Sequence, residues 1–299
     1  FMQALSNKNE KFMIKEPFKG LFTQGMVCHE TYKDKNNNWV SPDEIVLKNG
    51  KKYLKKKPTQ LVKIGPSESM SKSKRNTIDP ENIINNYGAD SVRLFILSDS
   101  PPEKDVQWSE EGIAASFKFI QKLWTLNNVI LGEINKNHLE NKSSEFIKFT
   151  NKFLKKITSN LENFNYNIIV ANLHELHSFL SKEIIRGYKK ETIIENYKKI
   201  LITMMPIIPH LSNECYKNLD KAGIIDWPKY DEEQIKDDFN TIVIQVNGKK
   251  RSLINASLEI SENDLMKLVN EDPQLAKYLL NKEIKKKIYV KNKLLNIII

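Results

Sequence analysis

The sequence has 299 residues, enough for two or three domains, and an apolar fraction of 40% with 13 Phe, 10 Tyr and 4 Trp excludes a disordered chain. Lys and Arg outnumber Asp and Glu by 47 to 37, and the net charge of +10 fits either a polyanionic partner or a lysine-rich composition without one. With only Cys28 and Cys215 and no apolar run of membrane-spanning length, a disulfide framework, a cysteine-based zinc site and a membrane protein are excluded.

The first hundred residues read as short β segments followed by helices. Residues 21–27 form an apolar run that predicts a strand, in which Gly25 fits either a bulge or the close approach of another backbone or a ligand. Residues 28–67 predict a small β-rich insertion, with Asn49-Gly50 as a hairpin turn. Its lysine-rich stretch, residues 48–57, fits a solvated edge or a contact with RNA.

Residues 67–76 (SESMSKSKRN) combine small hydroxyl side chains with the cations Lys72, Lys74 and Arg75. Hydroxyl and backbone N–H groups donate hydrogen bonds to phosphate oxygens, and ammonium groups neutralise phosphate charge. The composition therefore fits a movable phosphate-binding loop, but composition alone favours an exposed, flexible basic loop.

Two short helices are expected after this loop. Asp79-Pro80 is a helix start, and Gly88 can end that helix in a left-handed conformation. Asp90 is then expected to cap a second helix, which residues 100–102 (SPP) stop.

Residues 109–222 show apolar stripes at helical spacing, which predict a helix bundle. The stripes are Ile113, Phe117, Ile120 and Trp124; Phe146, Phe149, Phe153 and Ile157; Ile169, Leu173, Leu176, Leu180 and Ile184; Ile193, Tyr197, Ile200 and Met204; and Leu211, Cys215 and Leu219. His174 and His177 lie on one of these helices without a third candidate ligand beside them, so no metal site is expected.

A polar linker over residues 223–240 separates the bundle from a compact α+β unit. Residues 241–246 and 251–256 predict a hairpin around Asn247-Gly248. Two short helices, from Ser261 and near 275–280, and two further strands, 286–290 and 294–299, complete the unit.

The phosphate-loop candidate lies among motifs that resemble the leucyl-tRNA synthetases, a class I aminoacyl-tRNA synthetase family. Residues 70–73 (MSKS) match most of the KMSKS signature of that class. The leucyl-specific surroundings follow in order at 23–27 (TQGMV), 73–80 (SKRNTIDP), 87–94 (YGADSVRL), 108–112 (WSEEG), 245–249 (QVNGK) and 293–296 (KLLN). The resemblance covers almost the whole chain.

The resemblance implies a multidomain α/β, all-α and α+β protein. Residues 1–108 would be the end of a Rossmann-type catalytic domain, with the insertion at about 28–67 and the signature loop at 69–73. Residues 109–235 would be a helical-bundle domain of the anticodon-binding type, and residues 236–299 an α+β domain that binds tRNA.

The resemblance also implies the site. ATP, with Mg²⁺, and leucine would form leucyl-adenylate, and leucine would pass to tRNA(Leu) in the cytoplasm. Lys72 would be the catalytic residue that contacts the ATP phosphates, and Met70, Ser71 and Ser73 would complete the ATP-binding loop. The candidates for contact with tRNA phosphate are Lys249, Lys250, Arg251, Lys286 and Lys287.

Two departures from the family pattern stand out. The first lysine of the signature is Ser69 here, so its charge is either absent or supplied by Lys63 or Lys74. No His-x-Gly-His motif occurs, and the chain begins with Phe1, so we expect the last third of a monomeric enzyme that is inactive without its N-terminal part. A class I enzyme for valine, isoleucine or methionine, or a free-standing tRNA-binding protein without catalysis, are the alternatives.

Overall fold

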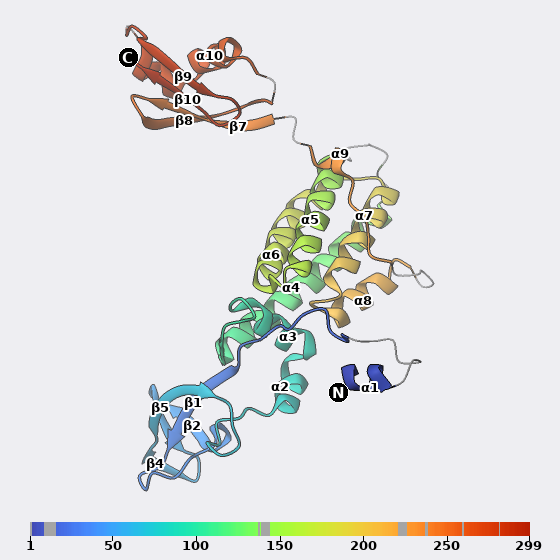
Figure 1. Cartoon of the computed structure of the whole chain (residues 1–299), viewed down its shortest axis with the longest axis vertical. Helices are drawn as coiled ribbons and strands as arrows, with labels where there is room; N and C mark the ends of the chain where they lie inside the picture. The colour runs from blue at the N-terminus through green and yellow to red at the C-terminus, as the bar shows by residue number, and fades with distance from the viewer. Residues whose placement is uncertain are drawn as a thin grey trace. The chain divides into compact units, whose positions relative to one another are not determined.

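The structure, a computed structural model, describes residues 2–8, 16–136, 138, 144–220, 226–236, 239–258, 260–280 and 282–299 (Figure 1). These residues form two compact units, Phe1–Tyr230 and Asp231–Ile299. The division of the first unit at residue 108, expected from the sequence, stays a prediction. None of the described helices is both long and apolar enough to cross a membrane.

The expected strand over residues 21–27 is wrong. After α1 (Met2–Lys8), residues 21–26 have no regular structure, and β1 begins only at Val27 and runs to Lys33. Leu21 is 95% exposed, so this apolar run is not buried as a sheet strand would be. Gly25 does mark a close backbone approach: its N–H donates to the Pro102 carbonyl at 2.8 Å, and a Cβ there would lie 2.1 Å from the Lys104 carbonyl oxygen.

A three-stranded sheet in the order β5-β1-β6 carries the signature loop. β5 (Lys63–Ser69) pairs antiparallel with β1, and β6 (Val106–Gln107) pairs parallel with β1. Between β1 and β5 the chain forms the short helix η1 (Pro42–Glu44) and a second sheet, β2 (Ile45–Lys48), β3 (Lys51–Leu54) and β4 (Lys57–Leu61). The Asn49-Gly50 hairpin turn is confirmed, with φ values of 48° and 73°.

Helices α2 (Pro80–Tyr87) and α3 (Ala89–Ser98) follow the loop as expected. The Asp79 carboxylate accepts a hydrogen bond from the Glu81 N–H at the start of α2, and Gly88, with φ of 80°, separates the two helices. Asp90 does not cap α3, because it lies inside the first turn of that helix. Its carboxylate instead accepts hydrogen bonds from the backbone N–H groups of His210 and Leu211, at 3.3 and 2.7 Å.

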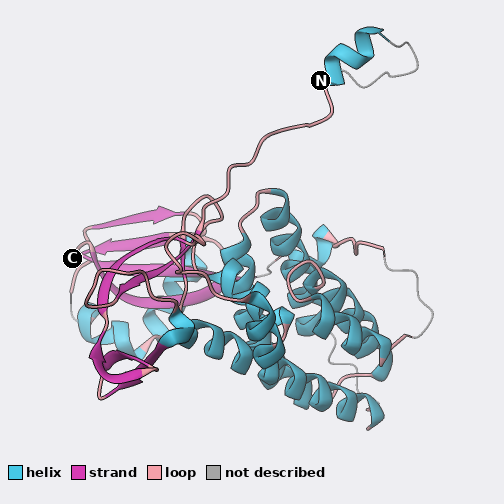
Figure 2. Cartoon of the chain, turned by 90° about the horizontal axis from the view of Figure 1, so that it is seen from below, coloured by secondary structure: helices cyan, strands magenta, loops and turns pink. Residues whose placement is uncertain are grey.

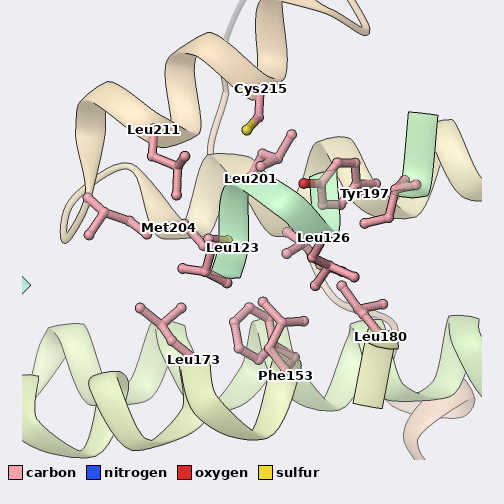
Figure 3. Close-up of a cluster of buried hydrophobic side chains, with 14 of the residues drawn as sticks. Leu123, Leu126, Phe153, Leu173, Leu180, Tyr197, Leu201, Met204, Leu211 and Cys215 are labelled. Atoms are coloured by element: carbon pink, nitrogen blue, oxygen red, sulfur yellow. The ribbon is translucent and has the colours of Figure 1, made fainter. Parts of the chain in front are cut away.

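The bundle contains α4 (Glu110–Asn135), α5 (Ser144–Glu162), α6 (Tyr166–Glu183), α7 (Lys190–Met204) and α8 (Pro209–Lys217), with η2 (Ile184–Arg186) after α6. Figure 2 shows the bundle as helices without strands. Side chains from all five helices meet in one buried cluster (Figure 3). The stripes expected to face the core on α5 to α8 are confirmed, with Phe149 and Leu219 only partly buried.

The stripe expected on α4 is only partly right. Ile113 is buried, but Trp124 is 41% exposed. The helix continues to Asn135. The buried side chains that enter the bundle core belong to a neighbouring stripe of this helix: Phe119, Leu123, Leu126, Ile130 and Ile134.

The second unit folds as expected from its sequence. After α9 (Glu232–Ile235), strands β7 (Phe239–Val246), β8 (Lys249–Ser257), β9 (Lys286–Val290) and β10 (Leu294–Ile298) form a sheet in the order β8-β7-β10-β9. Helices α10 (Glu262–Glu271) and α11 (Pro273–Leu279) join β8 to β9, and their apolar side chains share one buried cluster with the sheet. Asn247 and Gly248, with φ of 49° and 75°, form the predicted turn.

Candidate functional site

The signature loop leaves the sheet at the end of β5. Ser69 is the last residue of this strand and pairs with Cys28 on β1, and the Met70 N–H still donates to the Val27 carbonyl at 3.1 Å. Residues 72–75 then turn tightly, and the Arg75 N–H donates to the Lys72 carbonyl at 3.3 Å. Lys72 therefore stands at the start of a turn that is attached to the sheet edge.

Of the three cations in the loop, Lys72 alone makes no ion pair with a described residue. The Lys74 ammonium pairs with Glu68 on β5. The Arg75 guanidinium pairs with Glu44 of the insertion at 3.1 Å. Lys72 is exposed. Its ammonium group is thus available to a ligand from solvent, which could not be read from the composition of the loop.

The hydroxyl groups beside Lys72 suit phosphate. Ser73 is exposed, and its Oγ lies 3.3 Å from Oγ of Ser71. Ser71 Oγ also accepts a hydrogen bond from the Lys74 N–H at 3.3 Å. One unpaired ammonium group next to an exposed hydroxyl group is a donor set that fits the non-bridging oxygens of a phosphate chain.

Neither candidate replaces the charge missing at Ser69. Lys74 is already neutralised by Glu68. Lys63 pairs with Lys33 at the opposite end of β5, six residues away, which is roughly 20 Å along an extended strand. The hydroxyl of Ser69 lies 4.0 Å from the Cys28 sulfur instead.

In the lysine-rich stretch of the insertion, one lysine is held by contacts within the protein and the other five are exposed. The Lys52 ammonium contacts the Glu30 carboxylate at 2.5 Å and donates to the Tyr32 hydroxyl at 2.8 Å. The hydrogen bond from Lys52 lowers the pKa of Glu30. Burial acts to lower the pKa of Lys52, but the hydrogen bonds to Glu30 and Tyr32 outweigh it and raise that pKa. The exposed lysines are Lys48, Lys51, Lys55, Lys56 and Lys57.

The four lysines proposed to contact RNA lie at one end of the terminal sheet. Lys249 pairs with Val246, Val246 with Ile297, and Ile297 with Lys287, so one row crosses all four strands. Three strand spacings put the two edge lysines of this row roughly 14 Å apart. Lys250 and Lys286 are their neighbours in sequence, and all four are exposed.

Arg251, the fifth candidate, is engaged within its own unit. Its guanidinium carbon lies 4.3 Å from the ring centre of Tyr278, and Nη1 is 3.4 Å from the Tyr278 hydroxyl. The side chain is half-buried. Its geometry is that of a cation–π contact inside the domain, so it is less accessible to a partner than the lysines.

The two helix histidines are packed against an aromatic ring. His174 stacks on Phe119 with ring centres 3.7 Å apart, and burial lowers the pKa of both His174 and His177. Within the described part of the chain, no group of three or more His, Cys, Asp or Glu side chains is placed to hold a metal ion.

Asn76 is a residue of the site to which the sequence motifs assigned no role. It is fully buried directly after the turn, and its amide contacts the loop and both strands beneath it. The sequence shows only an asparagine directly after a run of serines and cations, and its burial is not visible there.

Two family models match the chain. Residues 58–109 match "tRNA synthetases class I (I, L, M and V)", and residues 143–265 match "Anticodon-binding domain of tRNA ligase". The first match contains the signature loop. The second begins next to α5 and extends into the terminal unit.

Relatives of known name match over nearly all of the chain. Leucine–tRNA ligase of Orientia tsutsugamushi (strain Boryong) is 40% identical over 292 residues, which is 96% of this chain and 34% of the relative. Leucine–tRNA ligase of Rickettsia bellii (strain RML369-C) is 38% identical over 305 residues, which is 100% of this chain and 36% of the relative. The chain thus spans about a third of the length of these relatives.

A solved structure shares the fold. The chain resembles LeuRS agnB2 of Agrobacterium radiobacter K84, in a ternary complex with tRNA and LeuAMS, with a TM-score of 0.67 at 19% identity. The match covers 99% of this chain and 34% of that one. The resemblance to leucyl-tRNA synthetases expected from the motifs is confirmed, and the chain is homologous over nearly its whole length to about one third of a leucine–tRNA ligase.

Proposed function

We propose that this chain is the C-terminal part of a leucine–tRNA ligase, to which it contributes one side of the ATP site and the surfaces that hold tRNA(Leu). The single observation that carries the proposal is the state of Lys72: in a loop that matches the class I signature, it is the cation without an ion-pair partner among the described residues. The homology to leucine–tRNA ligases supports leucine as the amino acid.

In the proposed reaction, an oxygen of the leucine carboxylate bonds to the α-phosphorus of ATP. The bond from that phosphorus to the bridging oxygen breaks, and pyrophosphate leaves. Negative charge grows on the departing pyrophosphate, and the Lys72 ammonium is suited to stabilise it. Such displacements depend mainly on positioning and on charge stabilisation.

The neighbours of Lys72 have supporting roles in this proposal. Ser71 and Ser73 would donate hydrogen bonds to phosphate oxygens, and Met70 would pack near the adenine. Mg²⁺ would enter with ATP, bound to the triphosphate oxygens. The second step moves leucine from the adenylate to the terminal adenosine of tRNA, and the remaining N-terminal part of the enzyme would supply the leucine pocket.

The bundle and the terminal unit would hold tRNA. We infer that the bundle binds tRNA and that Lys249, Lys250, Lys286 and Lys287 contact its phosphates. These four exposed cations lie at one sheet end without an ion pair to any described residue, and their charge matches that of an RNA backbone. We further propose that the enzyme is a cytoplasmic monomer, with both cysteines free, as they are here.

The alternatives differ in what they predict. The class I family model covers isoleucine, leucine, methionine and valine enzymes together, whereas the relatives given above are leucine–tRNA ligases. A free-standing tRNA-binding protein would have no use for Lys72, so a catalytic effect of this residue separates the two readings.

The test uses a chimera in which this chain replaces the matching third of the Orientia tsutsugamushi enzyme. We expect the chimera to catalyse leucine-dependent exchange of pyrophosphate into ATP, and the 299-residue chain alone to show none. Lys72→Ala should lower kcat for exchange by about 100-fold or more, with little change in the KM for leucine, because the contact strengthens in the transition state.

Lys118→Ala is the matched control, since it removes an exposed lysine of α4, outside the loop and the insertion. An active chimera whose exchange rate is the same with Lys72→Ala would remove this lysine from the mechanism. A folded chimera without any exchange would count against the ATP-binding role of the whole loop.

A further inference from the structure

We infer that Asn76 is a positioning residue: its buried amide closes the signature loop and fixes Lys72 relative to the sheet. The inference rests on the proposed function for its catalytic consequence, but not for its structural one. Asn76 does not reach the ligand itself, because it is 0% exposed beneath the turn.

The Asn76 amide is satisfied at both ends. Its Oδ1 accepts a hydrogen bond from the Ser71 N–H at 2.8 Å. Its Nδ2 donates to the carbonyls of His29 and Glu68, at 3.2 and 3.1 Å. A side-chain amide offers one acceptor oxygen and two N–H donors, and the three contacts engage the oxygen and both N–H groups.

These contacts join three segments of chain. His29 lies on β1 and Glu68 on β5, and the two residues are paired across the sheet. Ser71 is the residue directly before Lys72. Asn76 therefore ties the loop to the sheet at the position where the two strands carry the loop.

The same contacts set the place of Lys72. The Ser71 N–H and the Asn76 side chain close a ring around residues 72–75, in which Arg75 adopts φ of 53°, a left-handed conformation that non-glycine residues seldom take. Among the described residues, the Ser71 N–H has no other hydrogen-bond acceptor that would hold this end of the turn in place of the amide. The strained Arg75 backbone would then relax, and the Lys72 backbone would move with it.

Asparagine is specifically suited to this position. Aspartate has almost the same shape and keeps an acceptor for the Ser71 N–H. It cannot donate to the two strand carbonyls, and its charge would face their oxygens. An Asn76→Asp variant therefore separates the hydrogen-bonding role from a role in filling space.

The structural part is tested on the 299-residue chain with trypsin. Trypsin cuts after lysine and arginine, and the turn holds Lys72, Lys74 and Arg75. We expect Asn76→Ala and Asn76→Asp to raise the rate of cutting at these three positions about tenfold or more, because the turn opens more often. Asn82→Ala, an exposed asparagine on α2, is the control and should cut as the unchanged chain does.

A change confined to the turn supports the inference. Equal rates at the turn in all variants would overturn it. Faster cutting throughout the chain, with a lower melting temperature of the bundle, would show general unfolding and would also count against a local role.

The catalytic part is tested in the chimera defined above. We expect Asn76→Asp to lower kcat for exchange by about 100-fold, as misplacement of a catalytic group by about 1 Å can do, with the KM for leucine unchanged. If the unchanged chimera exchanges pyrophosphate and Asn76→Asp is equally active, the inference is wrong. If the unchanged chimera is inactive, the proposed function fails, and the trypsin result still decides whether Asn76 holds the loop.

Discussion

Residues 67–76 contain three cations, and the nearby acids determine which of them is left without an ion pair and can bind a phosphate. Glu68 is near in sequence, but Glu44, the partner of Arg75, is 31 positions away and reaches it only in the folded chain. The sequence indicated a phosphate loop and its lysine through the family signature. Which cations are neutralised, and that Asn76 is buried, depend on tertiary contacts that a linear pattern does not record.

Cys215 gives a residue-scale prediction for the bundle core. The thiol is 1% exposed, and burial raises its pKa to about 12 (Figure 3). In the unfolded chain a thiol ionises near its ordinary pKa of about 8.5. Between these two values only the unfolded state loses its proton, so stability is fully present below about pH 8.5 and falls as the pH rises toward 12.

The measurement is the free energy of unfolding in urea at several pH values from 8 to 11, under reducing conditions. The unchanged chain should lose up to about 1.4 kcal/mol per pH unit more than Cys215→Ala, which has no thiol to ionise. Identical pH profiles for the two proteins would show that Cys215 ionises equally well when folded. In the native chain at pH 8, Cys215 should also resist alkylation.

At the scale of elements, α3 holds the turn between α7 and α8. Arg93 Nε donates to the Ile207 carbonyl at 3.0 Å, and its Nη2 donates to the Pro206 carbonyl at 2.6 Å. One turn away on α3, Asp90 accepts from the first two N–H groups that α8 can offer, since Pro209 has none. The residue before α8 is Ile208, which has no capping side chain, so α3 supplies the cap.

We therefore expect Asp90→Ala to lower the free energy of unfolding by about 2–4 kcal/mol. The variant leaves the N–H groups of His210 and Leu211 without their acceptor, and α8 loses its cap. Asp99→Ala, an exposed acid at the end of the same helix, should change stability by less than about 0.5 kcal/mol. Urea unfolding of the two variants provides the comparison. Equal stabilities for the Asp90 and Asp99 variants would mean that α8 does not depend on this cap.

Sequence patterns predicted most elements because each buries one face with a regular period. They failed where two faces competed or where no partner lay alongside. On α4 a second apolar stripe through Phe119 and Leu123 enters the core, and Trp124 stays exposed. Residues 21–26 look like a strand but pair with nothing regular. Asp90 resembles a local cap but caps α8, where its partners His210 and Leu211 are 120 and 121 residues away.

At the scale of the whole molecule, the two units have complementary proposed tasks. The first presents Lys72 for a phosphate chain, and the second presents lysines from both edge strands of its sheet. The lysines of residues 249–250 and 286–287 lie at the same end of the sheet because of the strand order, which the sequence did not define. If the chain serves a leucine–tRNA ligase, both features act in one reaction.

The most direct test is the transfer of leucine to tRNA by the chimera with the Orientia tsutsugamushi enzyme. We predict that the chimera forms leucyl-tRNA. Replacing Lys249, Lys250, Lys286 and Lys287 by Ala should lower kcat/KM for tRNA and reduce its dependence on salt, with leucine-dependent pyrophosphate exchange unchanged, because only phosphate contacts are removed. A folded chimera that forms no leucyl-tRNA under conditions in which the parent enzyme does would contradict the account.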